Sequence, residues 1–245
     1  MFMRVVSTGS QAGNCYVLVS DSGEILLLDF GCQWRKILKG IDYQISKVVG
    51  GLLTHEHGDH SQSYKWLLEN TIPIFTNDEA AENFEIISGE KMIGKPEKTP
   101  LNIGSFSVIP FYLPHDGTPN FGFLIEHEEM GKLIYATDFE YIPFRFKAQR
   151  VQHFLIECNH MDDMVDRDSA KYSHVLKGHS SLSTVKKIIE VNKTTDLRNV
   201  VLCHLSRDNA DPEEMQKQVQ EVAGKWCNVT VAKAGLELKI SKYPW

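Results

Sequence analysis

The chain alternates short apolar runs with polar loops. Most runs are about four to eight residues long, the usual length of strands. Gly, Asn, Asp and Ser separate several of them, and Asp21-Ser22-Gly23 between two apolar runs is typical of a hairpin turn. The pattern predicts strands over residues 3–7, 15–20, 24–29, 48–53, 106–113, 122–127, 132–137, 152–157, 199–203, 228–232 and 236–241.

Amphipathic segments lie between some of these runs. They predict helices over residues 61–70, 78–87, 181–192 and 211–225. Asp78 is a suitable N-cap, and Pro212 suits a first helical turn. Strands interspersed with helices in both halves favour an α+β fold, two mixed β-sheets packed together with helices outside. We expect one domain over residues 1–245, built of two halves, roughly 1–130 and 131–245.

Composition restricts the class of protein. The 26 basic and 32 acidic residues give a net charge of −6, which excludes a protein that holds nucleic acid by bulk positive charge. The five cysteines are scattered and form no C-x-x-C pair, which favours a reducing compartment. The N-terminal residues do not read as a signal peptide, and no apolar run approaches the roughly 20 residues that span a membrane. We expect a cytoplasmic enzyme without a membrane partner.

Three histidines and an aspartate follow the fourth predicted strand in one short loop. In extended chain His55 and His57 lie on the same side, and the turn at Gly58 can bring Asp59 and His60 to a neighbouring point. Imidazole and carboxylate groups are ligands of zinc, manganese or iron. The alternative is a polar loop with unrelated histidines. The spacing favours a site that contributes ligands to each of two adjacent metal ions.

Three further polar residues directly follow predicted strands or stand within two residues of them. They are His115, Asp138 and His204. Each alone could be a structural residue, but beside the histidine-rich loop they are candidate metal ligands. Asp29 ends another strand, and we expect it to orient an imidazole or the loop itself.

The motif H-x-H-x-D-H at residues 55–60, with these downstream residues, resembles the metallo-β-lactamase-fold hydrolase superfamily. The resemblance implies a four-layer αβ/βα sandwich with two divalent metal ions at one edge. The ligand sets it implies are His55, His57 and His115 for the first ion, Asp59, His60 and His204 for the second, and Asp138 as the bridge. True β-lactamases usually have a cysteine in place of this bridging aspartate, so the phosphodiesterase, glyoxalase and lactonase branches are favoured.

Four other strings are similar to the bacterial YycJ/WalJ-type branch, whose members are implicated as DNA exonucleases in repair. The strings span residues 9–15, 157–160, 178–181 and 204–213. Two departures are Gly-His-Ser-Ser in place of the usual Gly-His-Leu-Ser, and a longer N-terminal loop. The resemblance implies a dinuclear-metal phosphodiesterase acting on DNA ends, a 5′-to-3′ exonuclease in which a metal-bridging hydroxide attacks phosphorus.

Two further histidines are candidates on the substrate side. His179 precedes a helix that begins near Ser181, where free N–H groups favour an anion. His179 or His160 could protonate the leaving oxygen, while Asp59 and Asp138 hold the nucleophile. The alternative is that both histidines are structural.

Several other features stay open. His127, His153 and His174 match no ligand position and are interpreted as packing or surface residues, and Asn14 as a turn residue. Basic residues that could line a phosphate-binding rim, or equally a solvated surface, are Arg145, Lys147, Arg150, Lys171, Lys177 and Arg207. Three other functions also fit: a small-molecule hydrolase (cyclic phosphodiester, thioester or lactone), a non-catalytic binding or regulatory module, and a diiron redox enzyme.

Overall fold

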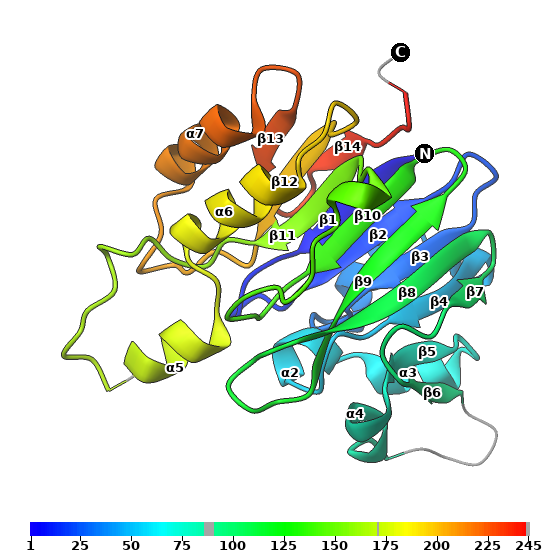
Figure 1. Ribbon diagram of the computed structural model, residues 1–245. Helices are drawn as coiled ribbons and strands as arrows, with labels where there is room; N and C mark the ends of the chain where they lie inside the picture. Colours follow the sequence, from blue (N-terminus) through cyan, green and yellow to red (C-terminus); the bar gives the residue numbers. More distant parts are fainter. Residues whose placement is uncertain (86–90, 171, 244–245) are drawn as a thin grey trace.

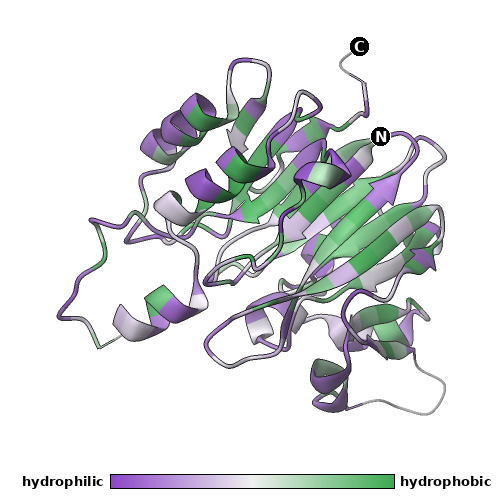
Figure 2. Cartoon of the chain, viewed as in Figure 1, coloured by the Kyte–Doolittle hydropathy of each residue, from purple (hydrophilic) through white to green (hydrophobic). Residues whose placement is uncertain are grey.

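The computed structural model describes residues 1–85, 91–170 and 172–243. Within them the chain forms two seven-stranded mixed sheets that pack face to face, with helices on the outer faces (Figure 1). The expected four-layer architecture is confirmed. Apolar residues are concentrated in the strands, whereas the helices and loops are more polar (Figure 2).

The first sheet has the strand order β14-β1-β2-β3-β4-β5-β6. Its members are β14 (Glu237–Lys239), β1 (Phe2–Ser7), β2 (Cys15–Val19), β3 (Ile25–Leu28), β4 (Val48–Leu52), β5 (Ile74–Asn77) and β6 (Met92–Lys95). Strands β3 to β6 are parallel neighbours. Their carboxyl ends therefore lie along one edge of the sheet.

The second sheet has the order β13-β12-β11-β10-β9-β8-β7. Its members are β13 (Asn228–Val231), β12 (Asn199–Cys203), β11 (His153–Glu157), β10 (Gly131–Ala136), β9 (Asn120–His127), β8 (Phe106–Leu113) and β7 (Leu101–Ile103). Strands β10 to β13 run parallel. Along the chain the first sheet ends with β6 and the second begins with β7, and β14 returns to the first sheet.

Three apolar clusters hold the layers together. The central one fills the space between the sheets with residues such as Leu28, Phe106 and Tyr135. The other two lie under the helices: α6 (Leu182–Asn192) and α7 (Pro212–Ala223) cover the second sheet, and α1 (Trp34–Gly40) and α3 (Tyr64–Glu69) cover the first. Burying these apolar stripes is the main stabilising contribution.

Two predicted helices differ from those observed. Residues 61–70 form parts of two short helices, α2 (Gly58–Ser61) and α3, because Ser63 leaves the helical path to donate its backbone N–H to Phe30 and its hydroxyl to Cys32. The helix predicted over 78–87 is α4 (Asp78–Glu82), and residues 86–87 lie outside the described part. Its N-cap is Asn77 and not Asp78, because the Asn77 side chain accepts from the N–H of Ala80.

Other short elements were not predicted. They are α1, β5, β6, β7, α5 (Tyr172–Gly178) and the 3-10 turns η1 (Ile45–Lys47) and η2 (Lys147–Gln149). Among the described residues, none of the helices is both long enough and apolar enough to pass through a membrane.

Candidate metal centre

The loop that follows β4 is held in place by Asp29, which follows β3. One carboxylate oxygen of Asp29 accepts from the backbone N–H of Thr54 at 2.9 Å. The other accepts from the Thr54 hydroxyl at 3.0 Å, from His60 Nδ1 at 2.7 Å and from the Tyr135 hydroxyl at 2.5 Å. Asp29 is fully buried and has a left-handed φ of 51°. The structure therefore places it against His60 and against the start of the histidine-rich loop.

A close backbone approach fixes the same loop from the other side. The N–H of Phe30 donates to the carbonyl of His60 at 2.8 Å. A Cβ on Gly31 would lie 1.7 Å from the Asp59 carbonyl oxygen and 2.4 Å from the His60 nitrogen. Only glycine fits at this contact. Asn14, interpreted above as a turn residue, also lies here, because its N–H donates to the Asp59 carbonyl at 2.7 Å.

The first histidine cluster contains His55, His57 and His115. The His55 ring lies 4.6 Å from that of His57 and 4.8 Å from that of His115, centroid to centroid. His115 Nε2 is 3.3 Å from His57 Nδ1. His55 and His115 are buried, and His57 is partly exposed. Three imidazoles from two separate strand ends thus converge at one point.

The second cluster contains Asp59, His60 and His204. Asp59 Oδ2 lies 3.3 Å from His204 Nε2 and 3.5 Å from His60 Nε2. His60 and His204 are fully buried, whereas the Asp59 side chain is 23% exposed. Asp59 is thus the member through which solvent reaches this cluster.

Asp138 lies between the two clusters with one oxygen toward each. Its Oδ2 is 3.8 Å from His55 Nε2 and 3.9 Å from His115 Nε2. Its Oδ1 is 3.3 Å from His60 Nε2 and 3.5 Å from His204 Nε2. When Asp138 is counted with either cluster, the four ligand atoms lie within 4.8 Å of one another. A carboxylate in this position can bridge two cations.

The outer nitrogens of four histidines face protein acceptors. His60 Nδ1 faces Asp29, His115 Nδ1 lies 2.7 Å from the carbonyl of Gly178, and His204 Nδ1 lies 3.1 Å from Glu157. His55 Nδ1 lies 3.0 Å from the Thr54 hydroxyl. Protons on these Nδ1 atoms leave each Nε2 lone pair directed inward, the usual arrangement of metal-ligating histidines.

The donor set fits divalent cations. Among the described residues, the buried Nε2 of His55 has no hydrogen-bond partner. A buried nitrogen without a partner is costly, whereas coordination would satisfy it. Nitrogen and carboxylate oxygen in this ratio match zinc, manganese or iron. The clusters therefore fit a dinuclear divalent metal site.

The two clusters differ in their electrostatics. Burial and the neighbouring His60 and His115 hold the pKa of His55 well below its usual value, and burial also lowers the pKa of His57 and of His115.

In the second cluster burial also lowers the pKa of the histidines, but the neighbouring carboxylates raise it by more. Asp138 and Asp29 hold the pKa of His60 well above its usual value. Asp138, Asp59 and Glu157 raise the pKa of His204 to about 10. The negative charge here attracts protons in the metal-free chain, and divalent cations can replace them.

Glu157 is the site residue that the sequence interpretation missed. It ends β11, is fully buried, and its Oε1 lies 2.7 Å from His179 Nδ1. Its Oε2 accepts from the backbone N–H of Phe139 and of Ser180 at 3.2 and 3.1 Å. Burial would raise the pKa of Glu157, but His179 and His204 lower it to about 2. Its position at a strand end, like that of Asp29, was the available signal.

His179 lies beside the second cluster and His160 does not join either. The side chain of His179 is 14% exposed, and its ring stacks on that of His204 at 5.3 Å. Burial alone would lower the pKa of His179. Glu157 and Asp138 raise it by more, so the pKa lies above its usual value. His160 is buried after β11, and among the described residues its ring nitrogens have no hydrogen-bond partner.

His127 and His153 lie apart from the clusters, whereas the ring of His174 lies edge-on to that of His179 at 5.9 Å. His127 contacts the Ser105 hydroxyl, His153 contacts Met130 and Asn199, and exposed His174 pairs with Asp116.

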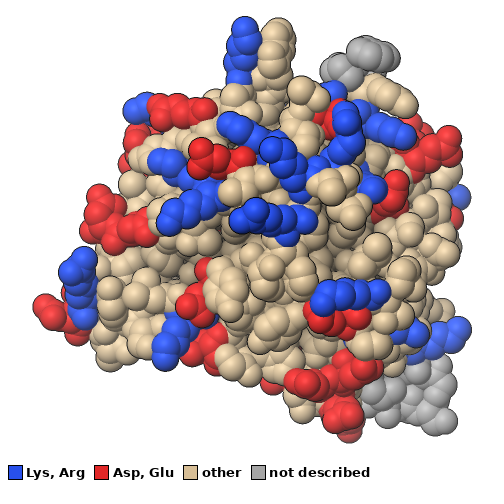
Figure 3. Space-filling model, in the orientation of Figure 1, with Lys and Arg blue, Asp and Glu red and all other residues tan. Residues whose placement is uncertain are grey.

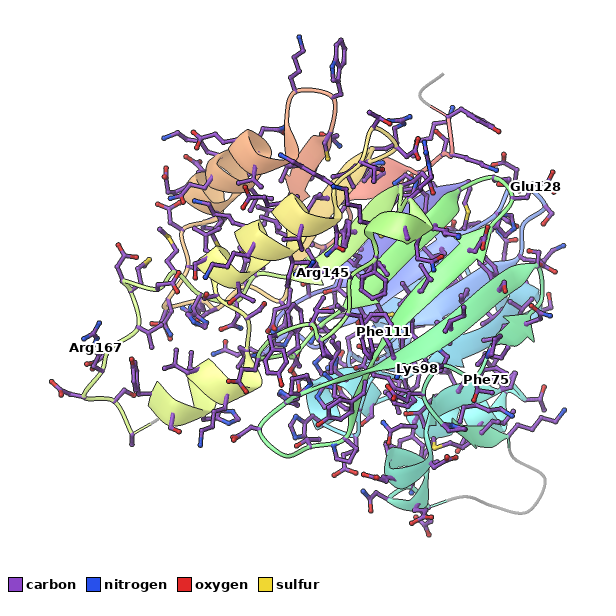
Figure 4. All side chains as sticks on the ribbon, in the orientation of Figure 1. Phe75, Lys98, Phe111, Glu128, Arg145 and Arg167 are labelled. Atoms are coloured by element: carbon purple, nitrogen blue, oxygen red, sulfur yellow. The ribbon has the colours of Figure 1, made fainter. Side chains whose placement is uncertain are left out.

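Among the described basic candidates, Arg150 lies away from the metal centre. Arg150 precedes β11, at the opposite end of the strand from Glu157, and pairs with Asp196 at 2.5 Å. Arg145 lies beside α6 (Figure 4). Lys171 lies outside the described residues. On the face shown in Figure 3, basic side chains gather in the upper half and acidic ones near α4.

Comparison with known proteins agrees with this geometry. The profile of the metallo-beta-lactamase superfamily matches residues 8–177. Exodeoxyribonuclease YycJ of Bacillus anthracis is 25% identical over 244 residues, covering 91% of this chain and 89% of that protein.

Two solved structures share the fold. The metallo-beta-lactamase fold protein YhfI from Bacillus subtilis superimposes with a TM-score of 0.76 at 20% identity, covering 97% of this chain and 98% of that one. A diphosphatase from the PhnP family gives a TM-score of 0.69 at 16% identity, covering 98% of each chain. With its two packed sheets, its histidine and aspartate clusters and a profile match over more than half of its length, the chain belongs to the metallo-beta-lactamase superfamily.

Proposed function

We propose that this hydrolase is a dinuclear-metal-dependent phosphodiesterase that degrades DNA from its ends, in the 5′-to-3′ direction. His55, His57 and His115 would hold one cation, Asp59, His60 and His204 would hold the other, and Asp138 would contribute to both. The observation that carries the proposal is the position of Asp138, with Oδ2 facing the first cluster and Oδ1 the second.

The chemistry expected of the bound ions is Lewis acidity, which activates a water molecule and neutralises charge on a phosphoryl group. The protein residues prepare this chemistry. Asp29 orients His60 through Nδ1, and Gly178 orients His115 in the same way. These contacts fix the orientation of the imidazoles that would hold the ions.

His179 supplies the proton for the leaving oxygen. Its Nδ1 is held by Glu157 at 2.7 Å, so that its Nε2 is free to donate toward a substrate. Glu157 and Asp138 raise the pKa of His179, which favours the protonated imidazole. The same carboxylate contacts His204 Nδ1 at 3.1 Å, so Glu157 couples the proton donor to the second cluster. Within the described residues, the ring nitrogens of His160 have no such contacts, and we assign it no proton-transfer role.

DNA is proposed as the substrate on the similarity to the YycJ exodeoxyribonuclease, which extends over nine-tenths of both chains. A phosphodiester also suits a site with two cation positions and a histidine proton donor. The net charge of −6 is consistent with this substrate, because two divalent ions would add about four positive charges at the site itself.

The test is a degradation assay with end-labelled DNA. Single- and double-stranded substrates with 5′-phosphate or 5′-hydroxyl ends are incubated with the protein and zinc or manganese. A cyclic phosphodiester and a thioester are tested in parallel. His153→Gln is the matched control, because it alters a buried histidine at the other end of β11.

Progressive shortening of DNA from the 5′ end, lost in Asp138→Ala and kept in His153→Gln, is the expected result. Turnover of a small ester without cleavage of DNA would replace the proposal by a small-molecule hydrolase. No turnover of any substrate with either metal would favour a non-catalytic module.

A further inference from the structure

A cavity of about 340 Å³ lies between the loop that follows β10 and helix α6. Residues 141–145 of the loop form one wall, and residues of α6 from Thr184 to Asn192 form the other. Tyr141 follows Asp138, the residue shared by both clusters, by only three positions. Their Cα atoms are therefore at most about 11 Å apart. The cavity, which we call the α6 groove, thus begins beside the metal centre.

Hydrogen bonds fix the two walls at both ends of the α6 groove. At the near end, Glu157 Oε2 accepts from the backbone N–H of Phe139 and of Ser180, which stand just before the two walls. At the far end, the N–H of Phe146 donates to the side-chain oxygen of buried Asn192 at 2.5 Å. Helix α6 has 11 residues and is about 16 Å long. The groove is therefore preformed and leads away from the carboxylate that holds the proposed proton donor.

The lining of the α6 groove is positively charged. Among the described residues that line it, Arg145 and Lys187 are basic and none is acidic. Both side chains are exposed, and neither has an ion pair or a hydrogen bond with another described residue. Two cations without a protein partner are available to pair with an anionic ligand.

A second cavity, at the carboxyl ends of β5 and β6, has the opposite charge. Asp78, Glu79 and Glu97 outnumber Lys95 in its lining. Figure 3 shows the same division, with basic side chains in the upper half of this face, where α6 lies, and acidic ones near α4. A chain of phosphates that reaches the metal centre is therefore repelled on the side of α4 and attracted on the side of α6.

Tyr141 gives the α6 groove an aromatic surface at the end nearest the metal centre. The residue is 52% exposed, and its ring contacts no other described ring. Phe144, in contrast, packs against Phe111 and Phe146 and so holds the loop in place. An exposed ring together with unpaired cations suits single-stranded nucleic acid, because a base stacks on the ring while the cations pair with phosphates. In a double helix the neighbouring base pairs already cover the faces of each base.

We propose that the α6 groove binds a single-stranded stretch of the DNA substrate next to the scissile phosphate. A base stacks on Tyr141, and phosphates pair with Arg145 and Lys187. This inference rests on the proposed function, because it makes the occupant part of a DNA substrate. It adds that the substrate is held as a single strand.

The test is the binding of a fluorescent single-stranded oligothymidylate to the full chain with manganese, followed by fluorescence anisotropy at several salt concentrations. Phosphorothioate linkages keep the charge of the strand and resist cleavage, so binding is read without turnover. Tyr141→Ala should raise Kd about tenfold, and Tyr141→Phe should stay within about twofold of wild type. Arg145→Ala/Lys187→Ala should also raise Kd about tenfold. It should make the dependence of log affinity on log salt concentration shallower by about 1.4, since each phosphate contact on a single strand contributes about 0.7.

Two controls change similar side chains away from the α6 groove. Tyr43→Ala alters a tyrosine that is 68% exposed, and Lys36→Ala/Lys39→Ala removes two exposed lysines of α1. Neither control should change the Kd. The duplex of the same oligothymidylate with oligodeoxyadenylate should bind more weakly than the single strand, and its affinity should not depend on the tyrosine of the groove. Thermal melting of each variant checks that its fold is intact.

Equal affinities for wild type and Tyr141→Ala, or no saturable binding of the single strand, would overturn the inference. An equal loss in Lys36→Ala/Lys39→Ala and in Arg145→Ala/Lys187→Ala would also overturn it, because binding would then follow overall charge. If DNA is cleaved in the degradation assay while binding ignores the groove, the proposed function stands and the groove alone is wrong. If binding depends on the groove as expected but DNA is not cleaved, the groove stands and the exonuclease proposal is wrong.

Discussion

Strand β11 has a buried ionisable residue at each end, and the two are held in opposite ways. At its start, His153 Nε2 lies 3.1 Å from the Met130 carbonyl and its Nδ1 lies 2.9 Å from the Asn199 amide. At its end, Glu157 faces His179 and His204. Burial lowers the pKa of His153 to about 4, so this histidine is neutral at pH 7.

The difference separates a structural polar residue from one suited to chemistry. His153 has both nitrogens satisfied by uncharged groups. Glu157 belongs to a network of carboxylates and histidines whose inner atoms can bind cations. Burial alone therefore does not identify a functional histidine. A functional histidine is better recognised by two observations. One is whether its partners are charged, and the other is whether both ring nitrogens are already in hydrogen bonds.

The largest expected effect comes from removing the residue shared by both clusters. Asp138→Ala should lower kcat about a thousandfold or more, because both cation positions lose a ligand, and His60→Ala should act similarly. We expect little unfolding, since the loss is of charge at an edge and not of apolar core. Steady-state kinetics and thermal melting measure the two quantities. Full activity in either variant would contradict the ligand assignment.

The second largest effect on kcat is expected from Glu157, the charged residue at the end of β11. Glu157→Gln keeps the shape of the side chain but removes its charge, and we expect a fall in kcat of about 10²- to 10³-fold. His179→Asn should cause a similar loss, and the double variant should be little worse than either single one, because the two residues act as a unit. Additive losses in this double-mutant cycle would show that they act separately.

Gly31 tests whether the loop geometry itself matters. Its substitution by alanine would push apart the backbones of residues 31 and 59–60. We expect a loss in kcat of about a hundredfold and a destabilisation of about 1–3 kcal/mol. Gly58→Ala is the matched control, because Gly58 lies next to Asp59 at the start of α2 and a Cβ there meets nothing within 4 Å. Comparable losses in both variants would mean that the close contact at Gly31 is unimportant.

The smallest effect on activity is expected at the start of β11. Since the pKa of His153 is about 4 in the folded chain and about 6.5 when unfolded, the unfolded chain binds the proton first. The contribution of His153 to the free energy of unfolding is fully present above pH 6.5. It falls by about 3 kcal/mol as the pH drops to 4.

Urea unfolding at pH 7 and pH 4.5 measures this loss. His153→Gln should lose about 2 kcal/mol less than wild type between these two pH values, and its turnover at pH 7 should be unchanged. An unaltered pH dependence, or a large loss of turnover, would contradict the structural role of His153.

The same contrast explains what the sequence could predict. His55, His57, Asp59 and His60 stand in one loop, so their spacing alone predicted their proximity. His115, Asp138 and His204 were found because each stands at or just after the end of an apolar strand. Glu157 was missed because its partners, 22 and 47 residues away, become neighbours only when the parallel strands pair.

The elements that were missed have a similar cause. Ser63 interrupts the helix predicted over 61–70 through contacts with residues 30 and 32, which no local pattern reveals. The short strands β5, β6 and β7 have only three or four residues each, too few for a clear alternation. Strands β11 and β12 of the second sheet were predicted closely, because they are buried on both faces and read as apolar runs.

The most direct test of the central claim is the metal content of the purified chain, measured by elemental analysis after dialysis against metal-free buffer. The account predicts about two equivalents of divalent metal per chain, with a clear loss in Asp138→Ala and no loss in His153→Gln. Wild-type protein that retains less than one equivalent, or that remains fully active after all metal is removed by a chelator, would contradict it.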